Sequence, residues 1–277
     1  MTTDADDGAI QGDQPVATQL PRGSNTGSVG FRALLAEARG ILSELRAAAM
    51  MQSRAADGTC ALFYRDRVIY AALPWADVDA FQRRLLASRA PDDDLLLTQL
   101  IDLIPSLAGR ALVDIGSFTG SAGFFLRALM GPDATHIFEP QSVMQESLTA
   151  AILRNSVSGG PIHFHSDILG EDGQEIEIGT STPVRLYQTR YLHRSGGGLR
   201  ARALDSFDLG KVGLINLDFY NDKVSVLRGA LGVIERDHPA IVMDLTARDV
   251  INVRELLSPL GYRDIRVGRN SMLMLPA

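Results

Sequence analysis

An α/β fold with a mostly parallel, doubly wound sheet is predicted by the order of elements between Ala111 and Pro140. A short apolar segment, Ala111–Ile115, leads into a glycine-containing turn, and an apolar helical segment follows over Phe124–Met130. A second short apolar segment, Thr135–Phe138, then ends at an acid, Glu139. This order of strand, turn, helix and strand is typical of the first half of a nucleotide-binding α/β domain.

The turn after the first strand indicates which kind of nucleotide fits. Its glycines are Gly116, Gly120 and Gly123. A dinucleotide-binding turn has two glycines within three residues, which lets the backbone approach a pyrophosphate, whereas Ser117 and Phe118 fill that gap here. The strand also carries an acid, Asp114, which would repel a phosphate but favours the sulfonium cation of S-adenosylmethionine. The turn therefore favours that methyl donor over NAD, and the structural alternative is a tight strand-to-helix turn beside a surface acid.

Acids follow the expected strands at regular places. Glu139 lies 25 residues after Asp114, a spacing at which an acid accepts hydrogen bonds from ribose hydroxyls. A helix is expected over Gln141–Asn155 and a strand over Ile162–His165, after which Asp167 would contact the adenine amino group or cap a helix. Because ligands of such sheets bind at the carboxyl ends of the strands, we expect four acids to converge on one crevice. They are Asp114, Glu139, Asp167 and Asp218.

Several phrases resemble those of a known family. They are Arg202–Phe207 (RALDSF), Val212–Asp218 (VGLINLD), Val226–Ala230 (VLRGA), Pro239–Asp244 and the ending Asn270–Pro276. Together with the donor turn, they resemble the FkbM family of class I methyltransferases over Pro91–Pro276, about two thirds of the chain. The resemblance implies a Rossmann-like sheet with an antiparallel last strand and O-methylation of a hydroxyl on a glycan or secondary metabolite. It also implies donor contacts by the turn and the strand-end acids: Asp114, Gly116, Ser117, Phe118, Gly120, Glu139, Pro140, Asp167 and Asp218.

One part of the chain departs from the family pattern. After Asp218 the family has an acid-glycine pair where this chain has Phe219, Tyr220 and Asn221, and Asn216 replaces a lysine. A methyltransferase-like module that binds the donor without transferring a methyl group is therefore the alternative function. A short-chain reductase is excluded, because neither of the two lysines follows a tyrosine at the spacing of a Tyr-x-x-x-Lys pair.

Methylation of a hydroxyl needs a general base near the methyl group. The candidates are Asp218 and His193. Asp218 is placed by its strand end and would otherwise orient the methionine amino group, and His193 lies in the segment Gly170–Leu199, which is expected to be loop-rich or hairpin-like on the acceptor side. A solvated loop is the alternative for that segment. No metal site is predicted.

Composition divides the chain into three parts. Residues 1–27 are polar and acidic and are expected to be disordered, residues 28–90 to form a helical and hairpin unit, and residues 91–277 to form the methyltransferase domain. In the middle part we expect an amphipathic helix over Phe31–Met51, a hairpin over Cys60–Leu73 and a helix over Trp75–Ser88, followed by a helix over Asp93–Leu107. This unit is expected to cover the acceptor site or to form a homodimer.

Charge and cysteine content exclude several classes. The net charge of −6 argues against a nucleic-acid surface, and the single cysteine, Cys60, permits no intramolecular disulfide. The N-terminus lacks the pattern of a secretory signal, and no apolar run is long enough for an integral membrane segment. We therefore expect a cytoplasmic protein with a small-molecule or glycan acceptor. The predominance of arginine over lysine suggests a GC-rich bacterial genome.

Overall fold

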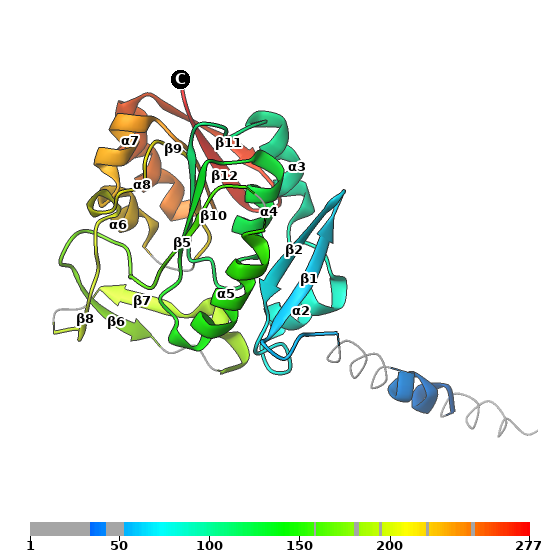
Figure 1. Cartoon of the computed structure of the whole chain (residues 1–277). Coiled ribbons are helices and arrows are strands. Elements are labelled where there is room, and N and C mark those ends of the chain that lie inside the picture. The colour runs from blue at the N-terminus through cyan, green and yellow to red at the C-terminus, as the bar shows by residue number, and fades with distance from the viewer. Residues whose placement is uncertain are drawn as a thin grey trace, which may run out of the picture. The chain divides into compact units, whose positions relative to one another are not determined.

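The computed structural model of the chain describes residues 34–42, 53–157, 159–179, 183–193, 196–219, 222–244 and 247–277 (Figure 1). The chain divides into two compact units, Met1–Arg46 and Ala47–Ala277. In the first unit, residues 34–42 form a helix whose apolar side chains, such as Leu34, are exposed. The rest of the helix expected over Phe31–Met51, and the whole tail 1–27, lie outside the described residues.

A central sheet of seven strands in the order β11-β12-β10-β9-β3-β4-β5 organises the second unit. The strands are β3 (Ala111–Ile115), β4 (Ala134–Phe138), β5 (Ile162–His165), β9 (Val212–Leu217), β10 (Ala240–Asp244), β11 (Tyr262–Val267) and β12 (Ser271–Pro276). Strand β12 is antiparallel to β10 and β11, whereas the pairs from β10 through β5 are parallel. The predicted Rossmann-like sheet with an antiparallel last strand is thus confirmed. Strand order reverses between β3 and β9, the point where such sheets bind ligands.

Helices cover both faces of this sheet, which explains why β3 and β9 are buried along their whole length. One face carries α3 (Asp94–Leu103), α4 (Ser121–Met130) and α5 (Ser142–Asn155), and the other carries α6 (Lys223–Arg228), α7 (Leu231–Asp237) and α8 (Ala247–Leu257) (Figure 1). Alternate residues of β3 enter separate cores, since Leu112 joins the first and Val113 the second. Short 3₁₀ turns at Leu204–Ser206 (η2) and Ser258–Leu260 (η3) complete the connections.

The predicted hairpin is present as β1 (Thr59–Tyr64) and β2 (Arg67–Ala72), which pair antiparallel. It packs on α4 and α5, and the side chain of Asn155 bonds to both backbone groups of Tyr70, accepting at 3.0 Å and donating at 2.7 Å. Residues 53–90 therefore lie in the same compact unit as the sheet.

The largest differences from the expected helix boundaries are at the start of α2 and the end of α3. Helix α2 spans Ala80–Ser88 and begins after the expected Trp75, because Asp79 caps it by accepting from the backbone N–H of Gln82. Helix α3 ends at Leu103 instead of Leu107, since the following Pro105 disfavours helical backbone in the residue before it.

The segment expected to be loop-rich or hairpin-like forms a small antiparallel sheet of three strands in the order β7-β6-β8, in agreement with the second alternative. Its strands are β6 (Glu175–Gly179), β7 (Arg190–His193) and β8 (Leu199–Arg200), and a 3₁₀ helix, η1 (Pro183–Gln188), precedes β7. None of the helices within the described ranges combines the length and the apolar character needed to cross a membrane.

Candidate functional site

A cavity of about 320 Å³ lies at the carboxyl ends of β3, β4 and β9, beside the point where the strand order reverses. The acids that line it are Asp92, Asp93, Glu139, Asp167, Asp218 and Asp244. Its charged lining also includes two arginines, Arg84 and Arg269. This excess of carboxylates favours a ligand that carries positive charge.

The turn after β3 lines the cavity through Gly116, Ser117 and Phe118. Gly116 has a φ of +78°, and a Cβ there would lie 2.6 Å from the Cβ of Phe219 and 2.7 Å from the carbonyl oxygen of Asp218. No side chain fits at this position, because the chain after β9 packs directly on the turn. Phe118 also has a positive φ of +45°, an uncommon conformation for a residue other than glycine.

Glu139 holds that conformation from the end of β4. Its carboxylate accepts from the backbone N–H of Phe118 at 2.7 Å and from that of Gln141 at 2.8 Å. The side chain is only 2% exposed, and this burial raises its pKa to about 7 although the two N–H groups oppose the shift. Glu139 and Pro140 both line the cavity, as expected. The acid therefore shapes the turn in addition to facing the cavity.

Asp114 does not converge on the cavity with the other acids, and that expectation is wrong. The side chain is fully buried and absent from the lining. It accepts from the Nδ2 of Asn216 at 2.6 Å, from the Ser117 hydroxyl and from the backbone N–H of Gly123. Since strand side chains alternate between the two faces of a sheet, the side chain of Asp114 points toward α4. Its burial there raises the pKa of the carboxyl group. Gly120 is likewise the cap of α4 and not part of the lining.

Asp218 does face the cavity, at the end of β9. Its backbone N–H donates to the carbonyl of Ile115 at 3.0 Å, which fixes it beside the turn. The side chain is exposed to the open cavity, but the protein around it displaces bulk water. This desolvation, with the charges of Asp114 and Asp244, raises its pKa to about 7, and the cation Lys223 opposes the shift.

Asp167 also lines the cavity, after β5. Its Oδ1 lies 3.1 Å from the Nη1 of Arg202, whose guanidinium stacks on the ring of Phe207 at 4.1 Å. The residue thus has a cationic partner, and its contact with adenine stays a prediction. His193 ends β7, but its side chain lies outside the described residues, so its role as a base is not tested.

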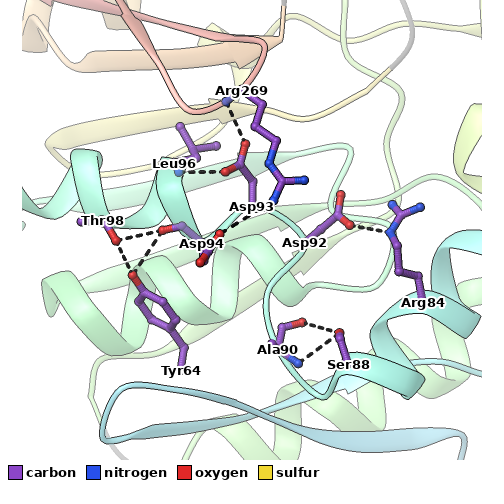
Figure 2. Close-up of polar contacts among 10 residues, drawn as sticks. All are labelled: Tyr64, Arg84, Ser88, Ala90, Asp92, Asp93, Asp94, Leu96, Thr98 and Arg269. Carbon is purple, nitrogen blue, oxygen red and sulfur yellow. Dashed lines mark hydrogen bonds and ion pairs between the residues drawn. The ribbon is translucent and has the colours of Figure 1, made fainter. Parts of the chain in front are cut away.

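A second wall of the cavity was not predicted from the sequence. Its charged residues are Arg84, Asp92, Asp93 and Arg269, and Figure 2 shows their polar contacts. Asp93 caps α3 by accepting from the backbone N–H of Leu96 at 2.9 Å, and it also accepts from the N–H of Arg269 at 3.2 Å. Nearby, the Nε of Arg84 lies 2.7 Å from Asp92. No role was predicted for these acids from the sequence, because their contacts with α2 and the β11–β12 turn depend on tertiary structure.

An aromatic surface continues this wall. The ring of Phe81 stacks on Tyr187 at 5.5 Å between centroids. It also lies 6.0 Å from the ring of Phe118, in the turn after β3. All three residues line the cavity. Helix α2 and η1 therefore place apolar rings beside the turn predicted to hold the nucleotide.

Three histidines form a separate cluster on β4 and β5. His136 stacks on His163 at 4.7 Å, and its Nδ1 lies 3.2 Å from the Nε2 of His165. His136 is buried, which, together with its two neighbours, lowers its pKa to about 4. Across the described part of the chain, no three His, Cys, Asp or Glu side chains are arranged to hold a metal ion.

Fold and cavity define an α/β protein with an acid-lined cavity at the topological switch point of its sheet. No protein-family model and no curated protein matches the chain. Solved structures with a similar fold include a methyltransferase FkbM from Methylobacillus flagellatus KT, with 15% identity and a TM-score of 0.46 over 60% of this chain and 43% of that one.

Two further structures are similar at the same level. One is a precorrin-6y C5,15-methyltransferase from Geobacter metallireducens GS-15, with 11% identity and a TM-score of 0.38 over 64% of this chain and 84% of that one. The other is M. jannaschii TYW2 in complex with AdoMet, with 7% identity and a TM-score of 0.39 over 78% of this chain and 84% of that one. At these identities the likeness concerns the fold alone.

Proposed function

We propose that the chain is an S-adenosylmethionine-dependent methyltransferase that acts on a hydroxyl of a glycan or secondary metabolite. The observation that carries the proposal is the acid-lined cavity beside the Gly116 turn, at the switch point of the sheet. A sulfonium and an ammonium group are favoured by this lining, whereas a pyrophosphate would be repelled.

The residues present fit such a donor. Glu139 lies at the end of β4, where a carboxylate can accept from ribose hydroxyls, and Asp167 lies after the next strand, on the side expected for adenine. The turn Gly116–Phe118 brings backbone close to the donor, and Asp218 is the acid for the amino-acid tail. Asp114 contributes indirectly by fixing the turn from below.

When bound, S-adenosylmethionine supplies a methyl group on a sulfonium, and the protein has to orient the acceptor oxygen in line with it. A pKa of about 7 leaves Asp218 near half ionised at neutral pH, which suits a general base for a hydroxyl as well as a partner for an ammonium group. His193 is the other proposed base. The Phe81, Arg84 and Tyr187 side of the cavity is the proposed acceptor wall.

We further propose a cytoplasmic, bacterial setting, in line with the single cysteine and the arginine-rich composition. The N-terminal unit, from its exposed apolar helix at residues 34–42, is the proposed homodimer contact.

Calorimetric titration with S-adenosylmethionine and S-adenosylhomocysteine tests the donor site. We expect micromolar binding that weakens at least tenfold in Glu139→Gln and Asp218→Asn. Surface variant Asp77→Asn, on an exposed turn outside the lining, is the matched control and should bind as the wild type does. Folded wild-type protein that binds neither nucleotide would contradict the proposal.

A donor-binding module without methyl transfer is the second candidate. It is supported by the sequence after Asp218, where Phe219, Tyr220 and Asn221 stand in place of the acid-glycine pair of the family pattern. Donor binding with no turnover across a broad panel of hydroxylated acceptors would favour this candidate.

A further inference from the structure

Lys223 is a buried cation that has no role in the function proposed above. The chain has only two lysines, and this one, at the start of α6, is 8% exposed whereas Lys211 is exposed. Its ammonium group donates to the carbonyl oxygen of Phe219 at 2.6 Å and lies 5.3 Å from the centre of the Phe219 ring. Both contacts tie the helix to the chain just after β9.

That tied segment is the one that packs on the donor turn. The carbonyl oxygen of Asp218 and the Cβ of Phe219 occupy the space in which a side chain at Gly116 would lie. The N–H of Asp218 is held by Ile115 on the neighbouring strand. The backbone of Asp218 is therefore fixed at its N–H by β3, and the residue after it is fixed at its carbonyl by Lys223.

The charges around Lys223 agree with this role. Carboxylates of Asp218, Asp244 and Asp249 favour the ammonium form, while burial lowers its pKa. In return, Lys223 lowers the pKa of Asp218, against the opposite effects of desolvation and of the acids Asp114, Asp244 and Asp92. Without this cation, Asp218 would face an almost wholly acidic surrounding.

The choice of lysine is informative in a chain that uses arginine nearly everywhere else. A compact ammonium on a flexible stem can reach a single buried carbonyl, whereas a planar guanidinium brings five N–H donors in a fixed arrangement. A buried position with one carbonyl acceptor is thus suited to lysine.

We propose that Lys223 is a positioning residue, which fixes the Asp218 carboxylate at the wall of the cavity by holding the carbonyl of Phe219. This inference rests on the proposed donor-binding function of the cavity. Lys223 itself does not line the cavity, so it acts through Asp218 and not by contact with a ligand.

The test is calorimetric titration of the full-length protein with S-adenosylhomocysteine between pH 6 and pH 8.5. Because an ionised Asp218 favours the ammonium group of this ligand, wild-type affinity should rise with pH through the titration of that carboxyl. In Lys223→Met we expect about tenfold weaker binding at neutral pH and a midpoint that moves to higher pH. Lys211→Met, the matched exposed control, should bind as the wild type does. Asp218→Asn should lose the part of the pH dependence that comes from Asp218 and keep the part that comes from Glu139, whose pKa is also raised to about 7.

Thermal unfolding separates positioning from folding. If Lys223→Met fails to fold, Lys223→Gln keeps a donor for the carbonyl but removes the charge, and its midpoint should still move upward. A folded Lys223→Met or Lys223→Gln protein with wild-type affinity and midpoint overturns this inference alone. Wild-type protein that binds no S-adenosylhomocysteine overturns the proposed function and this inference together.

Discussion

The side-chain amide of Asn216 donates to the Oδ1 of Asp114 at 2.6 Å, joining β9 to β3 beneath the turn that lines the cavity. The two residues are direct neighbours in the parallel pairing, and both side chains are buried. A neutral amide, and not a lysine, therefore accompanies the buried carboxylate. Any change to Asn216 should act on the turn through Asp114.

We expect Asn216→Leu to lower the free energy of unfolding by about 1–3 kcal/mol, because a buried carboxylate loses a hydrogen-bond donor. Urea unfolding at neutral pH measures the loss. In the double variant Asp114→Leu/Asn216→Leu, the loss should be smaller than the sum of the losses in the two single variants, because the bond between the two side chains is counted in both, although the Ser117 hydroxyl and the N–H of Gly123 also lose their acceptor. If the loss in the double variant equals the sum of the losses in Asn216→Leu and Asp114→Leu, the hydrogen bond does not couple the two strands.

Gly116→Ala should weaken nucleotide binding and lower stability, because a Cβ would collide with Asp218 and Phe219. The matched control is Gly109→Ala, whose φ of +76° nearly equals the +78° of Gly116 but whose Cβ would meet no atom within 4 Å. The control should therefore lose only the left-handed backbone preference, about 1–2 kcal/mol. Calorimetry and urea unfolding check both variants, and equal effects in the two would rule out a steric cause.

Acid should destabilise the protein through His136. Its pKa is lowered to about 4 in the folded state from 6.5 in the unfolded chain, so the unfolded state binds more protons between these values. Stability is then complete above pH 6.5 and is lost as the pH falls toward 4. We expect His136 to contribute a loss of about 1 kcal/mol between pH 7.5 and pH 5.5, against the opposite contributions of Glu139 and Asp218, whose raised pKa values stabilise the folded state as the pH falls.

His136→Phe tests this origin, since a ring of similar size cannot be protonated. Urea unfolding gives the free energy of unfolding at pH 7.5 and at pH 5.5. On going to pH 5.5, this free energy should fall less, or rise more, in the variant than in the wild type. The comparison at pH 8, where the imidazole is neutral, measures the packing cost of the substitution alone. An undiminished loss at pH 5.5 would assign the acid sensitivity to other groups.

Arg84→Met and Arg269→Met should separate acceptor binding from donor binding. The side chains of both arginines are largely exposed at the cavity wall, so loss of their ion pairs should change the free energy of unfolding by less than about 1 kcal/mol. We expect unchanged affinity for S-adenosylhomocysteine and a lower kcat/KM for any acceptor that the wild type methylates. Weaker binding of S-adenosylhomocysteine in both variants would instead place the donor on this wall.

Local sequence predicted most of the central sheet. Strand β5 coincides with the predicted Ile162–His165, and α5 begins one position after the predicted Gln141, because apolar periodicity and turn residues act over a few positions. The glycine turn and Glu139 were found for the same reason, since a strand followed by such a turn is a local signal. The α2 boundary was wrong because the Asp79 cap outweighed the apolar residues before it.

The sequence by itself determined the alternation of strands and helices, the glycine turn and the acids that follow the strands. Each of these depends on residues close together in the chain. Only the tertiary structure decided that Asp114 lies beneath the turn, that Asp93 meets Arg269, and that Lys223 holds the carbonyl of Phe219. Asp93 and Arg269 come from distant elements, and the direction of each side chain depends on helix packing and strand alternation. A linear pattern specifies neither until the sheet and its helices are assembled.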